Sequence, residues 1–190
     1  MKSTAEWIDG KGFREAVFEL VRLAACELPT DVEKALCEAK AAEEPGSSAE
    51  LTLSLFLKNI EMAKERQAPV CQDTGLPTFF INHPEDVSRR LLARVCQDAV
   101  AWATTKQYLR HNAVDSVTGK NSGNNIGEGF PAVYFTEWDD SAVEMTLILK
   151  GGGSENVSAQ YSMPYAPLDA GRDLEGVRRV VIDAVRRAVF

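Results

Sequence analysis

The sequence predicts an α+β protein, in which an N-terminal helical region precedes a mixed α/β unit with a β-hairpin and long helices. Three observations predict this class. Apolar residues recur at helical spacing through much of residues 13–66. Two short strand-like runs, 132–138 and 143–149, flank a polar turn sequence and suggest a hairpin. A strongly amphipathic pattern over residues 174–190 predicts a further helix.

The N-terminal region, residues 1–66, is predicted to contain three helices. The first covers about 13–26, where the apolar residues fall on one helical face. Thr30 as N-cap, with a glutamate three residues later, predicts a capping box for a second helix that ends near residue 44. Ser47 or Ser48 is expected to cap a third helix that reaches about residue 66.

Residues 67–190 form the second part of what we predict to be a single domain, and they carry the candidate site. Residues 78–81 are predicted to form a buried strand and 85–108 a long helix. The stretch 110–131 is rich in Asn and Gly and has no periodicity, and irregular segments of that length are often functional. The last predicted helix ends without a capping glycine or polar tail, so the domain is expected to be incomplete at its C-terminus.

Composition excludes several classes of protein. The net charge of -7 argues against a nucleic-acid surface, which needs clustered basic residues. No apolar run approaches the roughly 20 residues of a membrane span, and the N-terminus lacks a secretory signal. We therefore expect a cytoplasmic protein with no nucleic acid or membrane as partner. Its four cysteines are then reduced thiols or metal ligands, and Cys26, Cys37 and Cys96, within predicted helices, are expected to fill core positions.

The loop sequence Cys71-Gln72-Asp73-Thr74-Gly75 places a thiol, an amide and a carboxylate side by side. Such a cysteine is a ligand of a metal or cluster, a nucleophile, or a buried thiol. A nucleophile requires an electropositive neighbour to form the thiolate, and the adjacent carboxylate opposes this. The ligand interpretation is therefore favoured, while the other two remain open.

A second loop sequence, Lys150-Gly-Gly-Gly-Ser-Glu-Asn, follows the second strand-like run. Three glycines allow the backbone to approach a ligand closely and to direct several N–H groups toward an anion. The order of residues is not that of a phosphate-binding P-loop or of a dinucleotide fingerprint. A small carboxylate ligand fits better than a nucleotide, and a plain turn that ends the strand is the alternative.

Arg110 and His111 follow the long predicted helix. An arginine at this position can bind a carboxylate through two parallel hydrogen bonds. The alternative is a basic residue that balances the dipole at the helix C-terminus, which is a common role for both residue types. His111 alone is more typical of a structural histidine than of a ligand.

Four segments taken together, PVCQDTG, LRHNAVD, TGKNSGNN and LKGGGSENVS, occur here in an order and spacing that resemble those of a known family. This family is the iron–sulfur hydro-lyases of the class I fumarate hydratase and L-tartrate dehydratase type. The resemblance covers nearly the whole chain and is to the α subunit of two-subunit enzymes or to the matching N-terminal half of single-chain ones. CQDTG and KGGGSEN are its most specific motifs.

The resemblance implies a [4Fe-4S] cluster held by three cysteines, of which Cys71 matches the first. The other two ligands are expected in segments that this chain does not contain. Gln72, Asp73 and Arg110 match substrate contacts, with Asp73 also a candidate for proton transfer, and His111 has weaker support. Backbone near the substrate is expected from Gly151, Gly152 and Gly153.

The function implied by this resemblance is the interconversion of (S)-malate and fumarate, with L-tartrate dehydration as an alternative reaction. The expected partners are the dicarboxylate substrate and a β subunit or C-terminal domain, which supplies the other catalytic base, and an oligomer is expected. Intact KGGGSEN favours the fumarate branch, whereas Asn124, where many relatives carry Asp, leaves the substrate open. The chain alone is expected to be inactive, and a non-catalytic module that binds a dicarboxylate or a partner is the alternative of another class.

Overall fold

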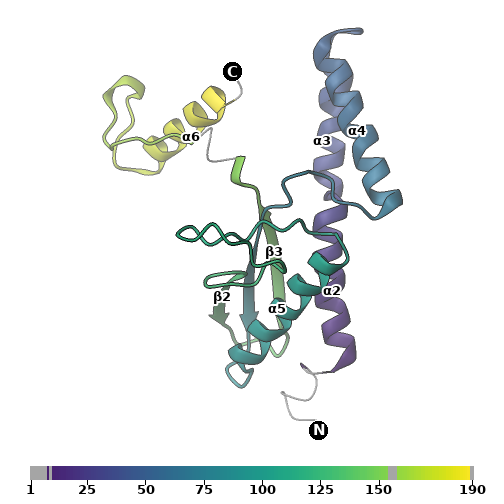
Figure 1. Cartoon of the computed structure of the whole chain (residues 1–190). Helices are drawn as coiled ribbons and strands as arrows, with labels where there is room; N and C mark the ends of the chain where they lie inside the picture. Colours follow the sequence, from purple (N-terminus) through teal and green to yellow (C-terminus); the bar gives the residue numbers. More distant parts are fainter. Residues whose placement is uncertain (1–7, 9, 154–157, 189–190) are drawn as a thin grey trace. The chain divides into compact units, whose positions relative to one another are not determined.

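The computed structural model describes Ile8, residues 10–153 and residues 158–188, and it divides into two units, Met1–Lys150 and Gly151–Phe190 (Figure 1). The elements of unit 1 are α2 (Lys11–Cys26), α3 (Thr30–Ala42), α4 (Ser48–Arg66), β1 (Leu76–His83), α5 (Arg89–Thr105), β2 (Ala132–Glu137) and β3 (Glu144–Lys150). Unit 2 contains a short 3-10 helix, η2 (Ala166–Leu168), and α6 (Leu174–Ala188). Helices and a small mixed sheet confirm the α+β class.

The predicted hairpin between the second and third strands is wrong, because β1 lies between them in the order β2-β1-β3. β1 pairs with β2 in parallel and with β3 in antiparallel orientation. The polar turn after β2 therefore passes the end of β1, where the Trp138 N–H donates to the His83 carbonyl at 3.1 Å. Phe79 and Ile81 of β1 are almost completely buried, which explains why this strand takes the central position with a partner on each side.

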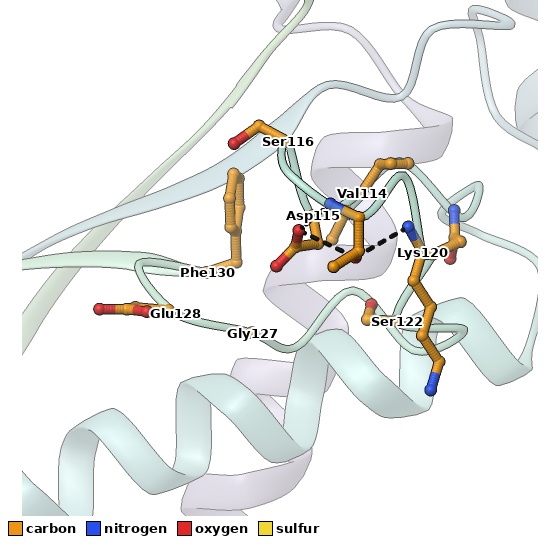
Figure 2. Close-up of a pocket in the computed structure, with 11 residues that line it drawn as sticks. Val114, Asp115, Ser116, Lys120, Ser122, Gly127, Glu128 and Phe130 are labelled. Atoms are coloured by element: carbon orange, nitrogen blue, oxygen red, sulfur yellow. Dashed lines mark hydrogen bonds between the residues drawn. The ribbon is translucent and has the colours of Figure 1, made fainter.

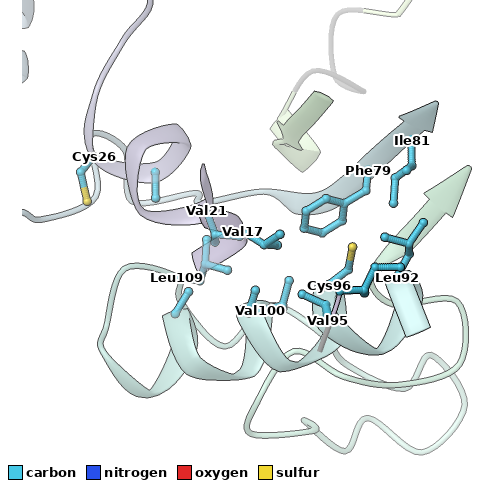
Figure 3. Close-up of a cluster of buried hydrophobic side chains, with 14 of the residues drawn as sticks. Val17, Val21, Cys26, Phe79, Ile81, Leu92, Val95, Cys96, Val100 and Leu109 are labelled. Atoms are coloured by element: carbon cyan, nitrogen blue, oxygen red, sulfur yellow. The ribbon is translucent and has the colours of Figure 1, made fainter. Parts of the chain in front are cut away.

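The core lies on one face of the sheet, where α2 and α5 pack against the inward side chains of β1 (Figure 3). Val17 and Val21 of α2 and Leu92 of α5 belong to this cluster with Phe79 and Ile81. The prediction that residues 78–81 form a buried strand is wrong for the alternate residues of the strand. Phe80 is 44% exposed and stacks on Tyr134 of β2 with ring centroids 5.3 Å apart, so the second face of the sheet is open among the described residues of unit 1.

The helices largely match their predicted ranges, although their caps differ in part. Thr30 is the first residue of α3 and Pro29 its N-cap, without a side-chain hydrogen bond, so the capping box predicted there is wrong. The predicted Ser47 cap of α4 is confirmed, because the Ser47 hydroxyl accepts from the Glu50 N–H at 3.1 Å, and the Glu50 carboxylate accepts from the Gly46 N–H at 2.8 Å. The long helix after β1 is shorter than predicted: its N-cap is Ser88, its first helical residue is Arg89 and its last is Thr105.

Within unit 2, the start of α6 is closely packed against the preceding turn. The Asp173 carboxylate accepts from the Gly176 N–H at 2.7 Å, which is the geometry of a helix cap. A Cβ at Gly176 would lie only 2.0 Å from the Gly171 carbonyl oxygen, so this helix position requires glycine. None of the helices in the described part of the chain combines the length and apolar character that a membrane crossing requires.

Candidate active site

The segment before Cys71 is fixed by the end of α2 and by a side chain in the middle of α4. The Val70 N–H donates to the Ala25 carbonyl near the end of α2 at 3.0 Å. The Val70 carbonyl accepts from the Asn59 side chain of α4 at 2.8 Å. Cys71 itself is exposed and follows directly, so a rigid helical support presents its thiol to solvent.

The Cys71–Gly75 loop turns tightly into β1. The Asp73 carboxylate accepts from the Gly75 N–H at 3.0 Å, two residues on, as in an Asx-turn. Gly75 has φ +71, and a Cβ there would lie 2.7 Å from the Lys150 carbonyl carbon and 2.8 Å from that of Leu149. Leu76, the next residue, pairs with Lys150. The end of the Cys71 loop and the residue that precedes the triple glycine therefore meet at one end of the sheet.

A cleft of about 700 Å³ contains three of the predicted site residues, Cys71, Gln72 and Arg110, together with His111. All four are exposed, as access to a ligand requires. Asp73 follows Gln72 but is not among the residues that line the cleft, and its carboxylate is engaged by the loop turn. The cleft also has polar lining residues that were not predicted, namely Asn59, Thr104, Gln107 and Asn112.

The glycines of the second motif belong to the other unit. Gly151, Gly152 and Gly153 begin unit 2, and the motif residues Ser154, Glu155 and Asn156 lie outside the described residues. A Cβ at Gly152 or Gly153 would meet no described atom within 4 Å. Packing within the described chain therefore does not require glycine at these two positions, and their role in substrate binding stays a prediction.

The end of α5 brings Arg110 to the Cys71 loop. After the helix ends, the N–H groups of Tyr108 and Leu109 donate to the Ala103 carbonyl at 2.9 and 3.3 Å. Leu109 is buried, which anchors the chain just before Arg110. Arg110 lies several residues beyond the last helical residue, Thr105, so the helix-dipole alternative is the weaker one for it.

Hydrogen bonds of polar side chains connect the Cys71 loop to the segment of Arg110. The Thr74 hydroxyl accepts from the Arg110 N–H at 3.0 Å and from the Asn112 side chain at 3.2 Å. Asn125, which is buried, accepts from the N–H groups of Asn112 and Ala113 at 2.8 and 3.0 Å. Thr74, Asn112 and Asn125 were not predicted individually as site residues. The one signal in the sequence was their position inside the motifs CQDTG, LRHNAVD and TGKNSGNN.

A second cavity, of about 570 Å³, lies within the irregular segment between α5 and β2 (Figure 2). Asp115 organises its wall by accepting from the Val117 and Thr118 N–H groups and from the Thr118 hydroxyl. These bonds lower the pKa of the Asp115 carboxyl, the Thr118 N–H being the largest cause. Figure 2 shows the Lys120 side chain extending away from Asp115. The segment is thus an ordered loop in which Asp115 has a structural role.

The four cysteines differ in exposure. Cys26 and Cys96 are buried, as predicted, and burial raises the pKa of the Cys26 thiol and raises that of Cys96 to about 12. The prediction that Cys37 fills a core position is wrong, because it is exposed. α3 has no buried residue, so its apolar spacing does not correspond to a covered face.

This difference predicts selective thiol chemistry. A thiol reagent such as iodoacetamide is expected to label Cys37 and Cys71 in the native protein, since both are exposed. Cys26 and Cys96 should stay unlabelled, because they are inaccessible and their raised pKa values keep them protonated at neutral pH. Peptide mass spectrometry identifies the labelled sites, and labelling in denaturant is the control in which all four react. Protection of Cys71 in the native protein with no ligand bound would contradict its position at the cleft.

The fit of an iron–sulfur cluster depends on the thiols that reach the cleft. Cys71 is suited as one ligand, because it is exposed in a cavity large enough for a bound group. Within the described residues no group of three His, Cys, Asp or Glu side chains converges to hold a metal ion. Neither buried cysteine lines the cleft, and neither does Cys37. The described residues would therefore supply one ligand of such a cluster, and its other ligands would have to be further thiolates.

The fold and the cleft define an α+β protein with one exposed thiol beside an arginine, and comparison with known proteins identifies its family. The family model for fumarate hydratase (Fumerase) matches residues 14–189. The chain belongs to this family.

Three relatives illustrate the range of similarity. A protein of Geobacillus stearothermophilus assigned as fumarate hydratase class I is 43% identical over 178 residues, which are 92% of this chain and 34% of the relative. A protein of Methanocaldococcus jannaschii assigned as L(+)-tartrate dehydratase subunit alpha is 34% identical over 92% of this chain and 61% of the relative. The L(+)-tartrate dehydratase subunit alpha of Escherichia coli (strain K12) is 32% identical over 73% of this chain and 46% of the relative. The chain thus spans between about a third and three-fifths of the length of these relatives.

Proposed function

We propose that this chain is the α component, in part or whole, of an iron–sulfur hydro-lyase that interconverts (S)-malate and fumarate. The observation that carries the proposal is the cleft in which Cys71, Gln72 and Arg110 come together from two distant parts of the sequence. The name of the Geobacillus relative, the most identical of the three, supports malate and fumarate as the substrate pair. The cytoplasmic location stays a prediction from the sequence.

Each side chain has a definite task in this proposal. Cys71 holds one corner of a [4Fe-4S] cluster, which when bound supplies Lewis acidity toward the hydroxyl group of the substrate. Arg110 binds one substrate carboxylate through its guanidinium. Gln72 orients the substrate by hydrogen bonding, and Asp73 takes part in proton transfer once its carboxylate leaves the Gly75 N–H. The backbone of Gly151–Gly153 contributes N–H groups to the second carboxylate.

The proposed partner is the polypeptide that carries the remaining cluster ligands and the other catalytic base. Support comes from the single cleft thiol in the described residues and from the greater length of the relatives. Two of those relatives are α subunits by name, which suggests a β subunit as that partner. We propose that the assembled enzyme is an oligomer and that the chain alone is inactive.

Dehydration of L-tartrate is the second candidate, and a specific observation favours it. Two relatives, at 34% and 32% identity, bear the name of the tartrate enzyme's α subunit. Tartrate has one hydroxyl group more than malate, so a site for it needs an additional hydrogen-bonding partner. Asn59 and Gln107 in the cleft are side chains of suitable chemistry for that purpose.

The test is an assay of the assembled enzyme, that is, the full-length protein containing this chain together with its partner, after anaerobic cluster reconstitution. Malate dehydration with fumarate formation is expected, with much lower activity on tartrate. Preference for tartrate would establish the second candidate. A reconstituted protein that carries the cluster and acts on neither diacid would contradict both.

Arg110→Lys tests the proposed carboxylate contact. Lysine keeps the charge but cannot form the two parallel hydrogen bonds, so we expect KM for malate to rise by about 10-fold or more, in line with the ~1.5–3 kcal/mol of a charged hydrogen bond. Steady-state kinetics measures this effect. Arg90→Lys, at an exposed position of α5, is the matched control and should leave KM unchanged. An unchanged KM in Arg110→Lys would remove Arg110 from the site.

A further inference from the structure

The backbone of Arg110 is held by side chains on both of its peptide groups. Its N–H donates to the Thr74 hydroxyl at 3.0 Å. Its carbonyl accepts from the Asn125 side-chain amide at 2.6 Å. Thr74 lies 6% exposed and Asn125 3% exposed, so both bonds are shielded from water. Buried hydrogen bonds of this kind restrict the position of the group that they hold.

Asn125 is suited to this position in three ways. Its side-chain oxygen accepts two bonds, from the N–H groups of Asn112 and Ala113. Its side-chain nitrogen donates two, to the Arg110 carbonyl and to the Thr104 hydroxyl at 3.0 Å. The amide thus uses all four of its hydrogen-bonding positions. Its backbone has φ +59, a left-handed conformation in which asparagine is favoured among residues with a side chain.

Thr74 joins this arrangement to the Cys71 loop. Its hydroxyl also accepts from the Asn112 side chain at 3.2 Å, and that side chain donates in turn to the Gly75 carbonyl at 3.3 Å. Thr104, near the end of α5, donates to the Val100 carbonyl and so connects Asn125 to the helix. A continuous set of hydrogen bonds therefore runs from α5 through Asn125 and the Arg110 segment to the loop of Cys71.

We propose that Thr74 and Asn125 are positioning residues that hold Arg110 at a fixed place relative to the Cys71 loop. Neither has to touch the substrate, and Asn125 is not among the residues that line the cleft. Their effect is exerted through Arg110, whose guanidinium must meet a carboxylate while the reacting carbon lies near Cys71. The inference rests on the proposed function for the identity of that carboxylate.

The test uses isosteric pairs in the assembled enzyme. Thr74→Val removes the acceptor, whereas Thr74→Ser retains a hydroxyl. Asn125→Asp keeps the acceptor and the left-handed backbone but places a carboxylate oxygen against the Arg110 carbonyl. Thr52→Val is the matched control, because Thr52 is an exposed residue of α4 outside the cleft and its hydroxyl donates to the Ser48 carbonyl of the same helix.

We expect Thr74→Val and Asn125→Asp to raise KM for malate by roughly 10-fold or more, since small displacements of a substrate-binding group have effects of this order. kcat and cluster absorbance should change far less, because uniform substrate binding is what is lost. KM in Thr74→Ser and Thr52→Val should remain near that of the unmodified enzyme. An unchanged KM in both disruptive variants, or an equal rise in the two control variants Thr74→Ser and Thr52→Val, would overturn the proposal.

Amide hydrogen exchange of the unmodified protein gives a readout that requires neither activity nor a stable variant. The amides of Arg110, Asn112 and Ala113 are expected to be protected, because each donates to a buried side-chain oxygen. Exchange of the Arg110 amide at the rate of an unstructured peptide would overturn the proposal, even if every variant failed to fold. Protection of the Arg110 amide in an enzyme without hydro-lyase activity would support the positioning role of Thr74 and Asn125 while contradicting the proposed function.

Discussion

Cys71→Ala is expected to abolish cluster binding and hydro-lyase activity in the assembled enzyme. The thiol of Cys71 is the one cysteine sulfur in the described residues that lines the cleft, so no neighbouring thiol replaces it. Changes in groups that only orient a metal ligand cost about 10- to 100-fold, and loss of the ligand itself should exceed that range. Anaerobic reconstitution followed by iron determination, visible absorbance and malate dehydration measures the loss.

Cys37→Ala provides the matched control for this experiment. Cys37 is also an exposed thiol, but it lies on α3 and outside the cleft, so cluster content and activity should be retained. Urea denaturation of both variants is expected to give a free energy of unfolding near that of the unmodified protein. Full activity in Cys71→Ala would contradict the ligand assignment. An equal loss in both variants would show that the effect is not specific to the cleft.

Gly75→Ala is expected to reduce the free energy of unfolding by about 2–5 kcal/mol, a large part of the ~5–15 kcal/mol typical of a domain. Two effects combine. The positive φ of Gly75 costs an L-residue roughly 1–2 kcal/mol. The new Cβ would also meet the backbone of Leu149 and Lys150 at 2.7–2.8 Å, and forced overpacking adds about 1–3 kcal/mol. Urea denaturation followed by tryptophan fluorescence is a suitable measurement, because Trp102 stacks on Phe18 within unit 1.

Gly123→Ala separates the two effects. Gly123 also has a positive φ, +77, but a Cβ there would find no atom within 4 Å. Gly123→Ala should therefore reduce the free energy of unfolding only by the conformational contribution of about 1–2 kcal/mol. The difference between the two variants measures the clash at the end of β3. If the two losses were equal, the close approach of the Cys71 loop to β3 would not be a feature of the protein in solution.

Local sequence patterns predicted most of those parts of the fold that are determined by residues close together in the sequence, namely the helices. The helical ranges were recovered because apolar spacing and serine caps act within one or two turns. The strand pairing was not predicted correctly, because the hairpin prediction assumed that strands consecutive in sequence pair with each other. The position of β1 depends instead on the burial of Phe79 and Ile81 under α2 and α5, which is a long-range property. The prediction that Cys37 is buried was wrong for the same reason, since helical spacing does not reveal whether another element covers a helix face.

The candidate site divides in a similar way. Cys71, Gln72 and Arg110 were selected from distinctive motifs and from the family resemblance, and the structure brings these three together. The supporting residues Thr74 and Asn125 were not selected, because their role appears only when segments distant in sequence meet. Thr74 bonds to Arg110 across 36 residues and Asn125 to Arg110 across 15. A single sequence contains no record of such distances between hydrogen-bonding groups.

The central place of β1 also sets the order in which the protein can fold. Its two partner strands, Ala132–Glu137 and Glu144–Lys150, lie far downstream in the chain. Helices α2 to α4 can form from local contacts as the chain emerges from the ribosome. β1 has neither partner strand at that stage, so both of its edges and Phe79 stay uncovered. Contacts between distant residues slow folding, because a long loop must be closed before they form. The Cys71 loop, which leads into β1, therefore gains its final shape late, and cluster insertion before residue 150 is synthesised would meet an unformed site.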